Sequence, residues 1–379
     1  MKSPIQPFKL ERFFARWEFQ APYLLCSSDL QGWPMRELLA LADEDTLALW
    51  ENLTLGYTET TGHPLLRQAI AGLYEQVSPE EILCFAGAEE AVYIAMRVLL
   101  RPGDHMIVTF PAYQSLYQVA DAIGAQVARL WLRPQMAGGE PVWGIDLDEL
   151  RRLIRPNTRL IVVNFPHNPT GALPDRAQWD ELIAIARGAG CTLFSDEVYR
   201  LLEYREADRL PAAADCYEKA LSLGVMSKPF GLAGLRIGWV ACRDRALLAE
   251  LAAYKDYTTI CNSAPAEILA LIALRARSVV LGRSRALIQS NLARVDEFMG
   301  RNRQWFRWIR PQAGSIAFPE WLGPVSVSQF CEELAQSAGV LLLPAGVYDY
   351  PGSHFRLGLG RENLPDALAR LEHFLATYR

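Results

Sequence analysis

The residue in this sequence best placed for covalent chemistry is a lysine in a short, glycine-rich turn. Lys228 lies among small residues in the stretch 227–239, and Arg236 follows it eight positions later at the start of an apolar run. A lysine that is partly desolvated, or close to another cation, has a lowered pKa, and its free amine can attack a carbonyl to form a Schiff base. The stretch alone is equally compatible with a surface loop that carries a solvated lysine and a salt-bridging arginine.

Three other polar stretches follow predicted strands. Residues 86–90 form a strand-to-helix turn whose small side chains would let backbone N–H groups approach an anion, unless it is an ordinary tight turn. Two X-Pro bonds and a glycine in residues 164–171 would hold Asn168 rigidly as a hydrogen-bond donor, although a plain proline turn has the same composition. In residues 195–199, Asp196 ends an apolar strand and would need a cationic partner if buried; a helix N-cap is the alternative.

From residue 81 onward, short apolar runs alternate with helical patterns. Strands separated by helices of this length are typical of βαβ units, so we expect an α/β fold with a mainly parallel, seven-stranded sheet covered by helices. The close succession of the last two strands favours one antiparallel member, and ligands of such sheets bind at the carboxyl ends of the strands. The predicted strands are 82–85, 106–110, 126–132, 160–164, 192–195, 219–226 and 236–241, and the predicted helices between them are 89–100, 113–123, 146–154 and 175–187.

The pattern changes after Asp244. Residues 246–257 are a predicted helix, 265–299 a long helical stretch that allows a break, and short strands and helices then mix up to a last helix from Asn363. Strands and helices without strict alternation predict a separate, smaller α+β domain. The expected division is an N-terminal arm with part of the small domain (1–45), a large domain (46–260) and a small domain (261–379).

Two segments are expected to lack regular structure. Residues 8–36 are rich in aromatic side chains but irregular in pattern, so we expect an arm that packs on another part of the protein or on a partner subunit. A short helix is predicted to follow it. Gly138 and Gly139 mark a loop insertion.

Composition narrows the class of protein. The chain has 379 residues and a net charge of -5, with no basic face for nucleic acid and no basic block for an anionic membrane. Its start lacks the apolar core of a signal peptide, and its apolar runs are shorter than a membrane-spanning helix. The seven cysteines are scattered singly, and no histidines pair at helical spacing. We therefore expect a reduced, metal-free, cytoplasmic protein.

Together, the four polar stretches resemble the aminotransferase class I/II family of pyridoxal-phosphate (PLP) enzymes, also called fold type I. The resemblance extends from about residue 57 to residue 361 and rests on order and spacing. The intervals similar to those of the family are Asn168 to Asp196 (28 positions), Asp196 to Tyr199 (3), Asp196 to Lys228 (32) and Lys228 to Arg236 (8).

The resemblance implies a role for each residue near the cofactor ring. Lys228 would form the Schiff base and then move a proton between the substrate Cα and the cofactor. Asp196 would pair with the pyridine nitrogen and keep it protonated, which makes the ring an electron sink. Asn168 and Tyr199 would hydrogen-bond the phenolic oxygen. Tyr113 would stack on the ring face, unless it is a core tyrosine at a helix start.

The resemblance also implies how the phosphate is held and how subunits pair. Tyr57 would reach the phosphate of the neighbouring subunit in a homodimer with shared active sites; a solvent-facing loop tyrosine is the alternative. The planar fork of an arginine suits a phosphate better than a lysine does. The groups implied to hold the phosphate within one subunit are Arg236, Ser227 and the backbone of Gly87, Ala88 and Glu89.

Arg356 matches the family's clamp on the substrate α-carboxylate, with Asn168 beside it. A bidentate pair there would align the Cα–H bond with the ring's π-system, whereas a salt bridge within the small domain is the alternative. Arg361, just beyond the predicted strand, is the weaker candidate. Two positions depart from the family pattern: His167 stands where many relatives have Asn, and Val225 stands where many have a phosphate-binding hydroxyl.

The implied activity is amino-group transfer between an L-amino acid and a 2-oxo acid, both small molecules. The same scaffold supports decarboxylation, elimination, cyclisation and, in a subgroup that acts on arginine, oxygen-dependent oxidation or hydroxylation. The arm, with Cys26–Trp33, lacks the usual glycine-rich start and is similar to that subgroup and to capreomycidine synthases, where Asp29 or Glu18 could meet a cationic side chain. A DNA-binding regulator is disfavoured because no helix-turn-helix or basic face accompanies the core.

Overall fold

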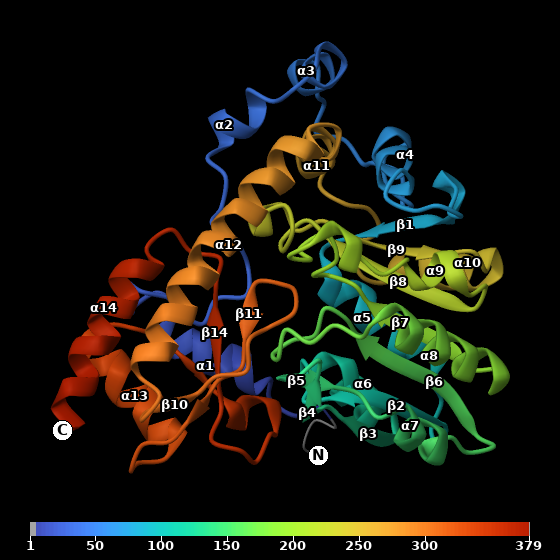
Figure 1. Ribbon diagram of the computed structural model, residues 1–379. Coiled ribbons are helices and arrows are strands. Elements are labelled where there is room, and N and C mark those ends of the chain that lie inside the picture. Colours follow the sequence, from blue (N-terminus) through green and yellow to red (C-terminus); the bar gives the residue numbers. More distant parts are fainter. Residues whose placement is uncertain (1–4, 379) are drawn as a thin grey trace.

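A seven-stranded sheet forms the centre of the computed structural model, which describes residues 5–378 (Figure 1). Six strands run parallel, and β9 alone is antiparallel to both of its neighbours, β1 and β8. The mainly parallel sheet with one antiparallel member is therefore confirmed. In spatial order the strands are β1 (Ile82–Phe85), β9 (Gly238–Cys242), β8 (Ala220–Val225), β7 (Thr192–Asp196), β6 (Thr158–Asn164), β2 (His105–Phe110) and β3 (Gln126–Trp131).

Burial explains why the sequence pattern located these strands. Every residue of the inner strands β2 and β8 is buried, so both appear as continuous apolar runs. The helices that cover the sheet include α5 (Ala88–Leu99), α6 (Ser115–Ile123), α7 (Leu147–Leu153) and α8 (Arg176–Gly188). Two of them begin with a side-chain cap, since Asp146 caps α7 and Asp175 caps α8.

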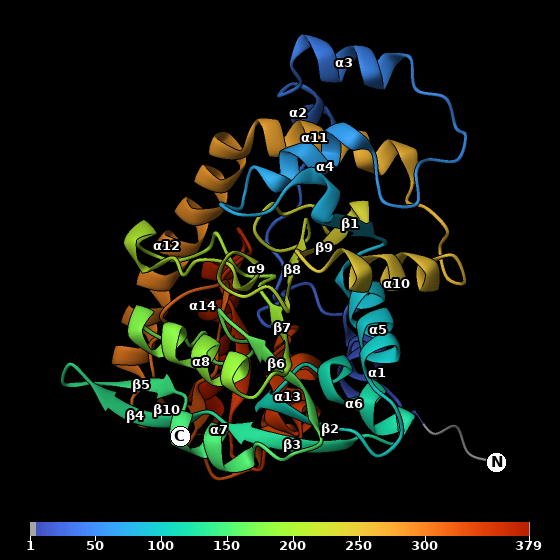
Figure 2. The same ribbon diagram turned by 90° about the vertical axis from the view of Figure 1, so that its right-hand side faces the viewer.

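The loop expected at residues 138–139 is a β-hairpin instead. Strands β4 (Arg133–Ala137) and β5 (Glu140–Gly144) pair antiparallel and project from the body of the molecule (Figure 2). Gly138 and Gly139 both have positive φ angles, 60° and 87°, which suit a tight two-residue hairpin turn. All of β4 is exposed, so no apolar alternation marked it as a strand.

The C-terminal part of the chain packs beside the sheet. The predicted break in the long helical stretch falls at Ala276, between α11 (Ala264–Arg275) and α12 (Arg277–Arg301). Figure 1 shows α12 running from α11 down to the C-terminal elements. Those elements are β10 (Phe306–Arg307), β11 (Ile316–Ala317), β12 (Glu320–Trp321), α13 (Val327–Ala338), β13 (Leu343–Pro344), η4 (Ala345–Tyr348), β14 (Phe355–Gly358) and α14 (Leu364–Leu375), and α10 (Arg245–Lys255) precedes α11.

The N-terminal arm contains a helix that the sequence analysis missed. Residues 8–36 were expected to be irregular, but α1 (Lys9–Trp17) buries Leu10 and Trp17 against Tyr348 and neighbouring apolar side chains. Charged residues between these positions weakened the apolar stripe. The prediction that the arm packs on another part of the protein is confirmed. The helices after α1 are α2 (Met35–Leu39), α3 (Glu44–Glu51) and α4 (Pro64–Ala71).

Helix α1 is attached to both sides of the molecule. On the side of the sheet, the backbone N–H of Lys9 donates to Gln114 Oε1 (2.8 Å), and Gln114 Nε2 donates to the carbonyl of Pro7 (3.0 Å). On the side of the C-terminal elements, the Lys9 ammonium forms an ion pair with Asp349, and Arg16 pairs with Glu332. The helix therefore spans the gap between the two parts.

Within residues 5–378, no helix combines the length and the apolar character that crossing a bilayer requires.

Candidate active site

Lys228 lies in the turn that follows β8 and is surrounded by protein. Its Nζ donates to Ser28 Oγ of the N-terminal arm (2.9 Å) and lies 5.9 Å from the centre of the Tyr199 ring. Burial lowers the pKa of the Lys228 amine to about 8; the nearby carboxylate of Asp29 opposes this shift, and Arg356 adds to it. A larger fraction of the amine is thus uncharged near neutral pH than for an exposed lysine, which favours nucleophilic attack.

Asp196 ends β7 and is 6% exposed. Burial raises the pKa of its carboxyl to about 7, against the opposing effects of a hydrogen bond from the Val198 N–H (3.2 Å) and of Lys228. No ion pair to Asp196 is found within residues 5–378. A turn rather than a helix follows it, which excludes the N-cap alternative. A buried carboxylate without an ion-pair partner suits a cationic ligand atom.

Arg356 in β14 and Asn168 in the loop after β6 share a buried cluster with Tyr348. Arg356 Nη1 donates to the Tyr348 hydroxyl (2.7 Å) and approaches Asn168 Oδ1 (3.5 Å), while the Tyr348 hydroxyl donates to the same Asn168 oxygen (3.1 Å). Asn164 Oδ1 accepts from the Asn168 backbone N–H (2.7 Å) and so fixes the loop. The loop position of Asn168 is thus set by contacts from three separate segments.

The Arg356 guanidinium is only 2% exposed, yet it has no acidic partner among the described residues. Its Nε donates to the Cys26 carbonyl (2.9 Å), and its Nη2 has no hydrogen-bond partner in the described part of the chain. The salt-bridge alternative is therefore excluded for these residues. Arg361 differs, because its Nη2 forms an ion pair with Asp29 and lies 3.0 Å from each carboxylate oxygen. Arg356 is the arginine available to an added carboxylate.

The start of α5 and Arg236 form a compact anion site. Gly87 precedes the helix with φ 90° and ψ 173°, and a Cβ there would lie 2.6 Å from Arg236 Nη2. A Cβ on Gly238 would lie 2.8 Å from the carbonyl carbon of Gly87 and 2.9 Å from the amide of Ala88. Backbone N–H groups of a helix start and a guanidinium are thus brought together, as phosphate binding requires.

Two other residues of the implied phosphate site lie beside this helix start. Ser227 is half-buried next to Lys228, and its hydroxyl has no hydrogen bond within residues 5–378. The Glu89 side chain is exposed to solvent, yet many protein atoms lie around its carboxyl. Ser115 Oγ donates a hydrogen bond to Glu89 Oε2 (3.2 Å). Burial raises the pKa of the Glu89 carboxyl to about 7, and nearby Glu11 adds to the increase.

The two predicted tyrosines outside this cluster differ in their surroundings. Tyr113 is half-buried; its ring packs on Phe8 with centroids 4.9 Å apart, and its hydroxyl approaches Glu11 Oε1 (3.4 Å). Tyr57 is 90% exposed and has no contact with the Lys228 site within one subunit. The structure therefore brings the predicted residues of one subunit together, whereas Tyr57 is exposed and makes no contact with them within residues 5–378.

Sequence reasoning missed two residues of the site. Ser28 contacts Lys228 across 200 positions, and Tyr348 joins Arg356 to Asn168; neither has a local motif that would have indicated it. His167 is bound within its own loop, where Nδ1 lies 2.8 Å from Thr170 Oγ1, while its buried Nε2 has no hydrogen-bond partner within residues 5–378. Burial lowers the pKa of His167 to about 3, so it is uncharged.

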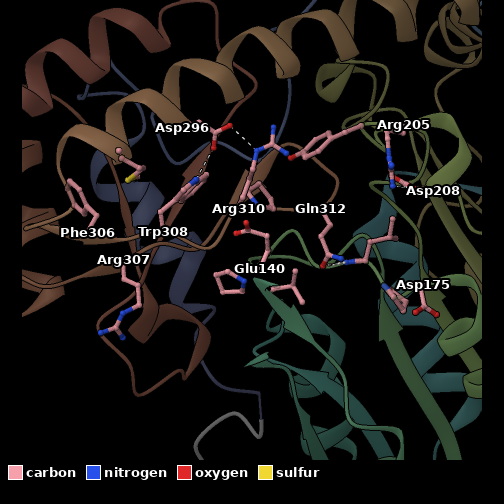
Figure 3. Close-up of a pocket in the computed structure, with 18 of the residues that line it drawn as sticks. Glu140, Asp175, Arg205, Asp208, Asp296, Phe306, Arg307, Trp308, Arg310 and Gln312 are labelled. Carbon is pink, nitrogen blue, oxygen red and sulfur yellow. Dashed lines mark hydrogen bonds and ion pairs between the residues drawn. The ribbon is translucent and has the colours of Figure 1, made fainter. Parts of the chain in front are cut away.

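A further cavity lies away from the Lys228 site. It has a volume of about 1170 Å³ and lies beside β5 and α12, lined among others by Glu140, Asp296 and Arg310 (Figure 3). Asp296 accepts hydrogen bonds from Trp308 Nε1 and from Arg310 Nε, both at 2.8 Å. None of the residues of the Lys228 site lines this cavity. Because most of its charged side chains already have ion-pair partners, we assign no chemistry to it.

The Lys228 site fits PLP. An anion site at the start of α5, a buried carboxyl at Asp196 without an ion pair, and an amine with a lowered pKa lie close enough for Asp196 and Arg236 to act electrostatically on the Lys228 amine. These three groups match the phosphate, the ring nitrogen and the aldehyde of PLP. The fold and this site thus define a PLP-dependent enzyme of fold type I.

The chain belongs to the aminotransferase class I and II family, which matches residues 24–371. It is 31% identical to the capreomycidine synthase of Streptomyces vinaceus over 99% of this chain and 94% of that protein. It is 30% identical to the arginine–pyruvate transaminase of Pseudomonas aeruginosa over 83% of this chain and 81% of that one. A PLP-dependent aminotransferase structure from Streptococcus suis 89-1591 superposes with a TM-score of 0.91 at 33% identity, covering 100% and 99% of the two chains.

Proposed function

We propose that this PLP-dependent aminotransferase moves an amino group between an L-amino acid and a 2-oxo acid, with Lys228 as its central catalytic residue. The observation that carries the proposal is the position of the Lys228 amine, whose pKa is about 8, between Asp196 and Arg356. PLP, when bound to this amine, supplies a ring that stabilises the negative charge left at the substrate Cα. Once the substrate amine has taken its place on the cofactor, the freed Lys228 Nζ would move the proton between the substrate Cα and the cofactor.

The other buried residues orient the reacting groups. Arg356 holds the substrate α-carboxylate through its unpartnered Nη2, which fixes the direction of the Cα–H bond. Asp196 holds the proton on the ring nitrogen, because a cation beside it compensates for the burial of its carboxylate. Asn168 and Tyr199 hydrogen-bond the ring oxygen, and Tyr113 covers the ring face. Burial raises the pKa of Tyr199, so its hydroxyl stays a hydrogen-bond donor.

Phosphate binding is assigned to Arg236, Ser227 and the backbone of residues 87–89. Arg236 has a φ angle of 53°, and its side chain lies so close to Gly87 that a Cβ on Gly87 would clash with it. The proposed domain division remains 1–45, 46–260 with PLP, and 261–379. Location in the cytoplasm is likewise proposed, with support from seven cysteines that form no disulfide.

A homodimer with shared active sites is also proposed. The segments that contain Tyr57 and Tyr257 contact one another through Thr58 Oγ1 and the Asn262 carbonyl (3.1 Å). They expose large apolar side chains, which are rarely left uncovered together on a monomer. The exposed fractions are Leu55 86%, Tyr57 90%, Tyr257 90% and Ile260 49%.

Mixing two inactive variants tests the shared site. Lys228→Ala lacks the amine, and Tyr57→Ala lacks the side chain proposed to cross to the partner subunit. A mixed dimer keeps one complete site, so unfolding and refolding an equal mixture restores up to about a quarter of wild-type activity. Activity equal to the mean of the two separate variants would contradict sharing, and sedimentation would show independently whether the protein is a dimer.

The reaction is tested by following the absorbance of the bound cofactor with single amino acids. Amino transfer converts the cofactor to its amine form, and an added 2-oxo acid converts it back. Oxygen consumption with release of hydrogen peroxide, and no requirement for an acceptor, would contradict this function.

Cyclisation of arginine or a derivative is the second candidate function. The similarity to a capreomycidine synthase over 99% of this chain favours it, and so does the arm, which places Ser28 against the Lys228 amine. Mass spectrometry distinguishes the two functions, because transfer yields a 2-oxo acid, whereas cyclisation yields a ring-containing product that keeps its α-amino nitrogen.

A further inference from the structure

The segment between α3 and α4 contains Tyr57 and has little structure of its own. Residues 53–63 form neither helix nor strand, and Figure 2 shows them as an open loop at the side of the molecule. Within the described chain the segment has one internal backbone hydrogen bond, from the Gly62 N–H to the Glu59 carbonyl (2.9 Å). Leu55 and Tyr57 are 86% and 90% exposed. The position of Tyr57 therefore depends on contacts that other elements make with this segment.

Lys255, the last residue of α10, makes one of these contacts. Its side chain is fully buried, and its Nζ donates to the Thr60 carbonyl (2.6 Å). Lys255 has no ion pair among residues 5–378, and burial lowers the pKa of its amine, against the nearby charge of Glu90. A buried ammonium group is costly, and the proposed reaction does not use this one. Because a charged donor bonds more strongly than a neutral one, Lys255 firmly restrains Thr60.

Glu267 and Asn262 hold the same segment from the start of α11. Both side chains are buried, and Glu267 lies in the first turn of the helix. Glu267 Oε1 accepts from the backbone N–H of His63 (3.3 Å) and from Asn262 Nδ2 (2.9 Å). The Asn262 carbonyl accepts from Thr58 Oγ1 (3.1 Å). We call Lys255, Asn262 and Glu267 the anchor, because together they contact positions 58, 60 and 63.

Close packing leaves the anchored residues little freedom. Gly62 has a φ angle of 102°, and a Cβ there would lie 2.6 Å from Cys84 Sγ and 3.4 Å from Glu267 Oε1. The Cys84 N–H, in β1, donates to the Thr61 carbonyl (3.0 Å). Residues 58–63 are thus held against β1 and α11, whereas residues 55–57 remain exposed beyond this base.

We propose that the anchor positions Tyr57, so that its hydroxyl reaches the phosphate of PLP in the partner subunit. This proposal rests on the proposed function, because it takes the homodimer with shared active sites as given. The residues of the anchor are positioning residues, which act through Tyr57 and touch neither cofactor nor substrate. Tyr57 directly precedes the anchored residues, so a shift of about 1 Å in them is enough to lose the hydrogen bond of its hydroxyl.

A double-mutant cycle on the affinity for PLP tests this role. Tyr57→Phe removes the hydroxyl and should raise the Kd for PLP at least about tenfold, the loss of a hydrogen bond to a charged group. Lys255→Met replaces the ammonium group by an apolar group of similar length and should raise the Kd about 3- to 10-fold. In the Tyr57→Phe background, Lys255→Met should change the Kd less than about twofold, because the contact that it displaces is already lost. Fluorescence titration of the cofactor-free dimer with PLP measures all four values.

Two further variants and kcat distinguish positioning from a general loss of structure. Thr58→Val, at a half-buried position, detaches the segment from Asn262 alone and should raise the Kd about two- to fivefold, again only while the Tyr57 hydroxyl is present. Lys219→Met removes an exposed lysine that has no ion pair in the described part of the chain, and it should leave the Kd unchanged. At saturating PLP, kcat of Lys255→Met should stay within about twofold of wild type, whereas a misfolded site would lower it.

The outcomes separate this proposal from the proposed function. Full additivity of Lys255→Met and Tyr57→Phe, or an unchanged Kd in both Lys255→Met and Thr58→Val, would overturn the role of the anchor. An unchanged Kd in Tyr57→Phe would reject the shared phosphate site itself, and the anchor's role with it. A coupled cycle in a protein that turns over no amino acid would instead reject the proposed reaction and support the anchor.

Discussion

Arg356 and Asn168 share one hydrogen-bonding partner, the hydroxyl of Tyr348, which accepts from the arginine at 2.7 Å and donates to the amide oxygen at 3.1 Å. The residue proposed to hold the substrate carboxylate and the residue proposed to hold the ring oxygen are thereby positioned together. All three side chains are buried, so solvent cannot replace a lost contact.

Tyr348→Phe removes this shared hydroxyl and leaves Arg356 Nη1 and Asn168 Oδ1 with only their long contact of 3.5 Å to one another. We expect kcat/KM for the amino acid substrate to fall about tenfold, mainly through KM, and the protein to lose about 1–3 kcal/mol of stability. Steady-state kinetics and thermal unfolding measure the two effects. Tyr350→Phe is the control, because the Tyr350 hydroxyl has no hydrogen bond within residues 5–378. Equal behaviour of the two variants would show that the hydroxyl positions nothing.

Lys228→Ala abolishes covalent attachment of PLP while leaving the phosphate site intact. After borohydride reduction and digestion, wild-type protein should carry the cofactor on the peptide that contains Lys228, and the variant on none. Lys255 makes this a discriminating test, because it is also a buried lysine with a lowered pKa, here through burial. Label on the Lys255 peptide would show that the central assignment is wrong.

Gly87→Ala should weaken cofactor binding for a steric reason, and Gly103→Ala serves as the control for backbone strain. The new Cβ would lie 2.6 Å from Arg236 Nη2, so the guanidinium must leave its place beside the α5 start. We expect the Kd for PLP to rise at least about tenfold, the loss of one charge-assisted contact. Gly103→Ala introduces a similar positive φ, 87° against 90°, with no atom within 4 Å of the Cβ. Similar PLP affinities in the two variants would mean that backbone strain alone decides the effect.

Asp196→Asn changes the pH dependence of stability of the cofactor-free protein. The carboxyl pKa is near 4 in an unfolded chain and about 7 in the fold, so the folded state binds the proton more tightly. Stability contributed by this proton is present below about pH 4 and is lost as pH rises to about 7. We expect the free energy of unfolding of Asp196→Asn to exceed that of wild type by up to about 4 kcal/mol at pH 8, and this difference to be smaller at pH 5.

Denaturation in urea at the two pH values measures that difference. Added PLP should stabilise wild type more than Asp196→Asn, since only the carboxylate gains from a cationic ring nitrogen. A difference in stability that is the same at pH 5 and pH 8 would contradict a raised carboxyl pKa.

The sequence predicted the sheet well because its inner strands are fully buried and appear as apolar runs. Lys228, Asp196 and Asn168 were found because each stands at the end of such a strand, where a parallel sheet collects its ligands. Ser28 was not found because it lies 200 positions from Lys228, and Tyr348 was not found because no motif marks it and its contact with Asn168 spans 180 positions, although it lies only eight positions before Arg356. Helix α1 was missed because much of its surface remains exposed and charged.

The attachment of α1 at both of its sides has a kinetic consequence. A ligand below the helix is enclosed by contacts from Lys9 to Gln114 and Asp349, groups on opposite sides of the gap. We expect entry and exit of a ligand to require one set of these contacts to break, whereas the chemistry at Lys228 does not. Residence time of a bound amino acid is therefore governed by residues that never touch it, and weakening Lys9 would speed exchange without changing which bond is broken.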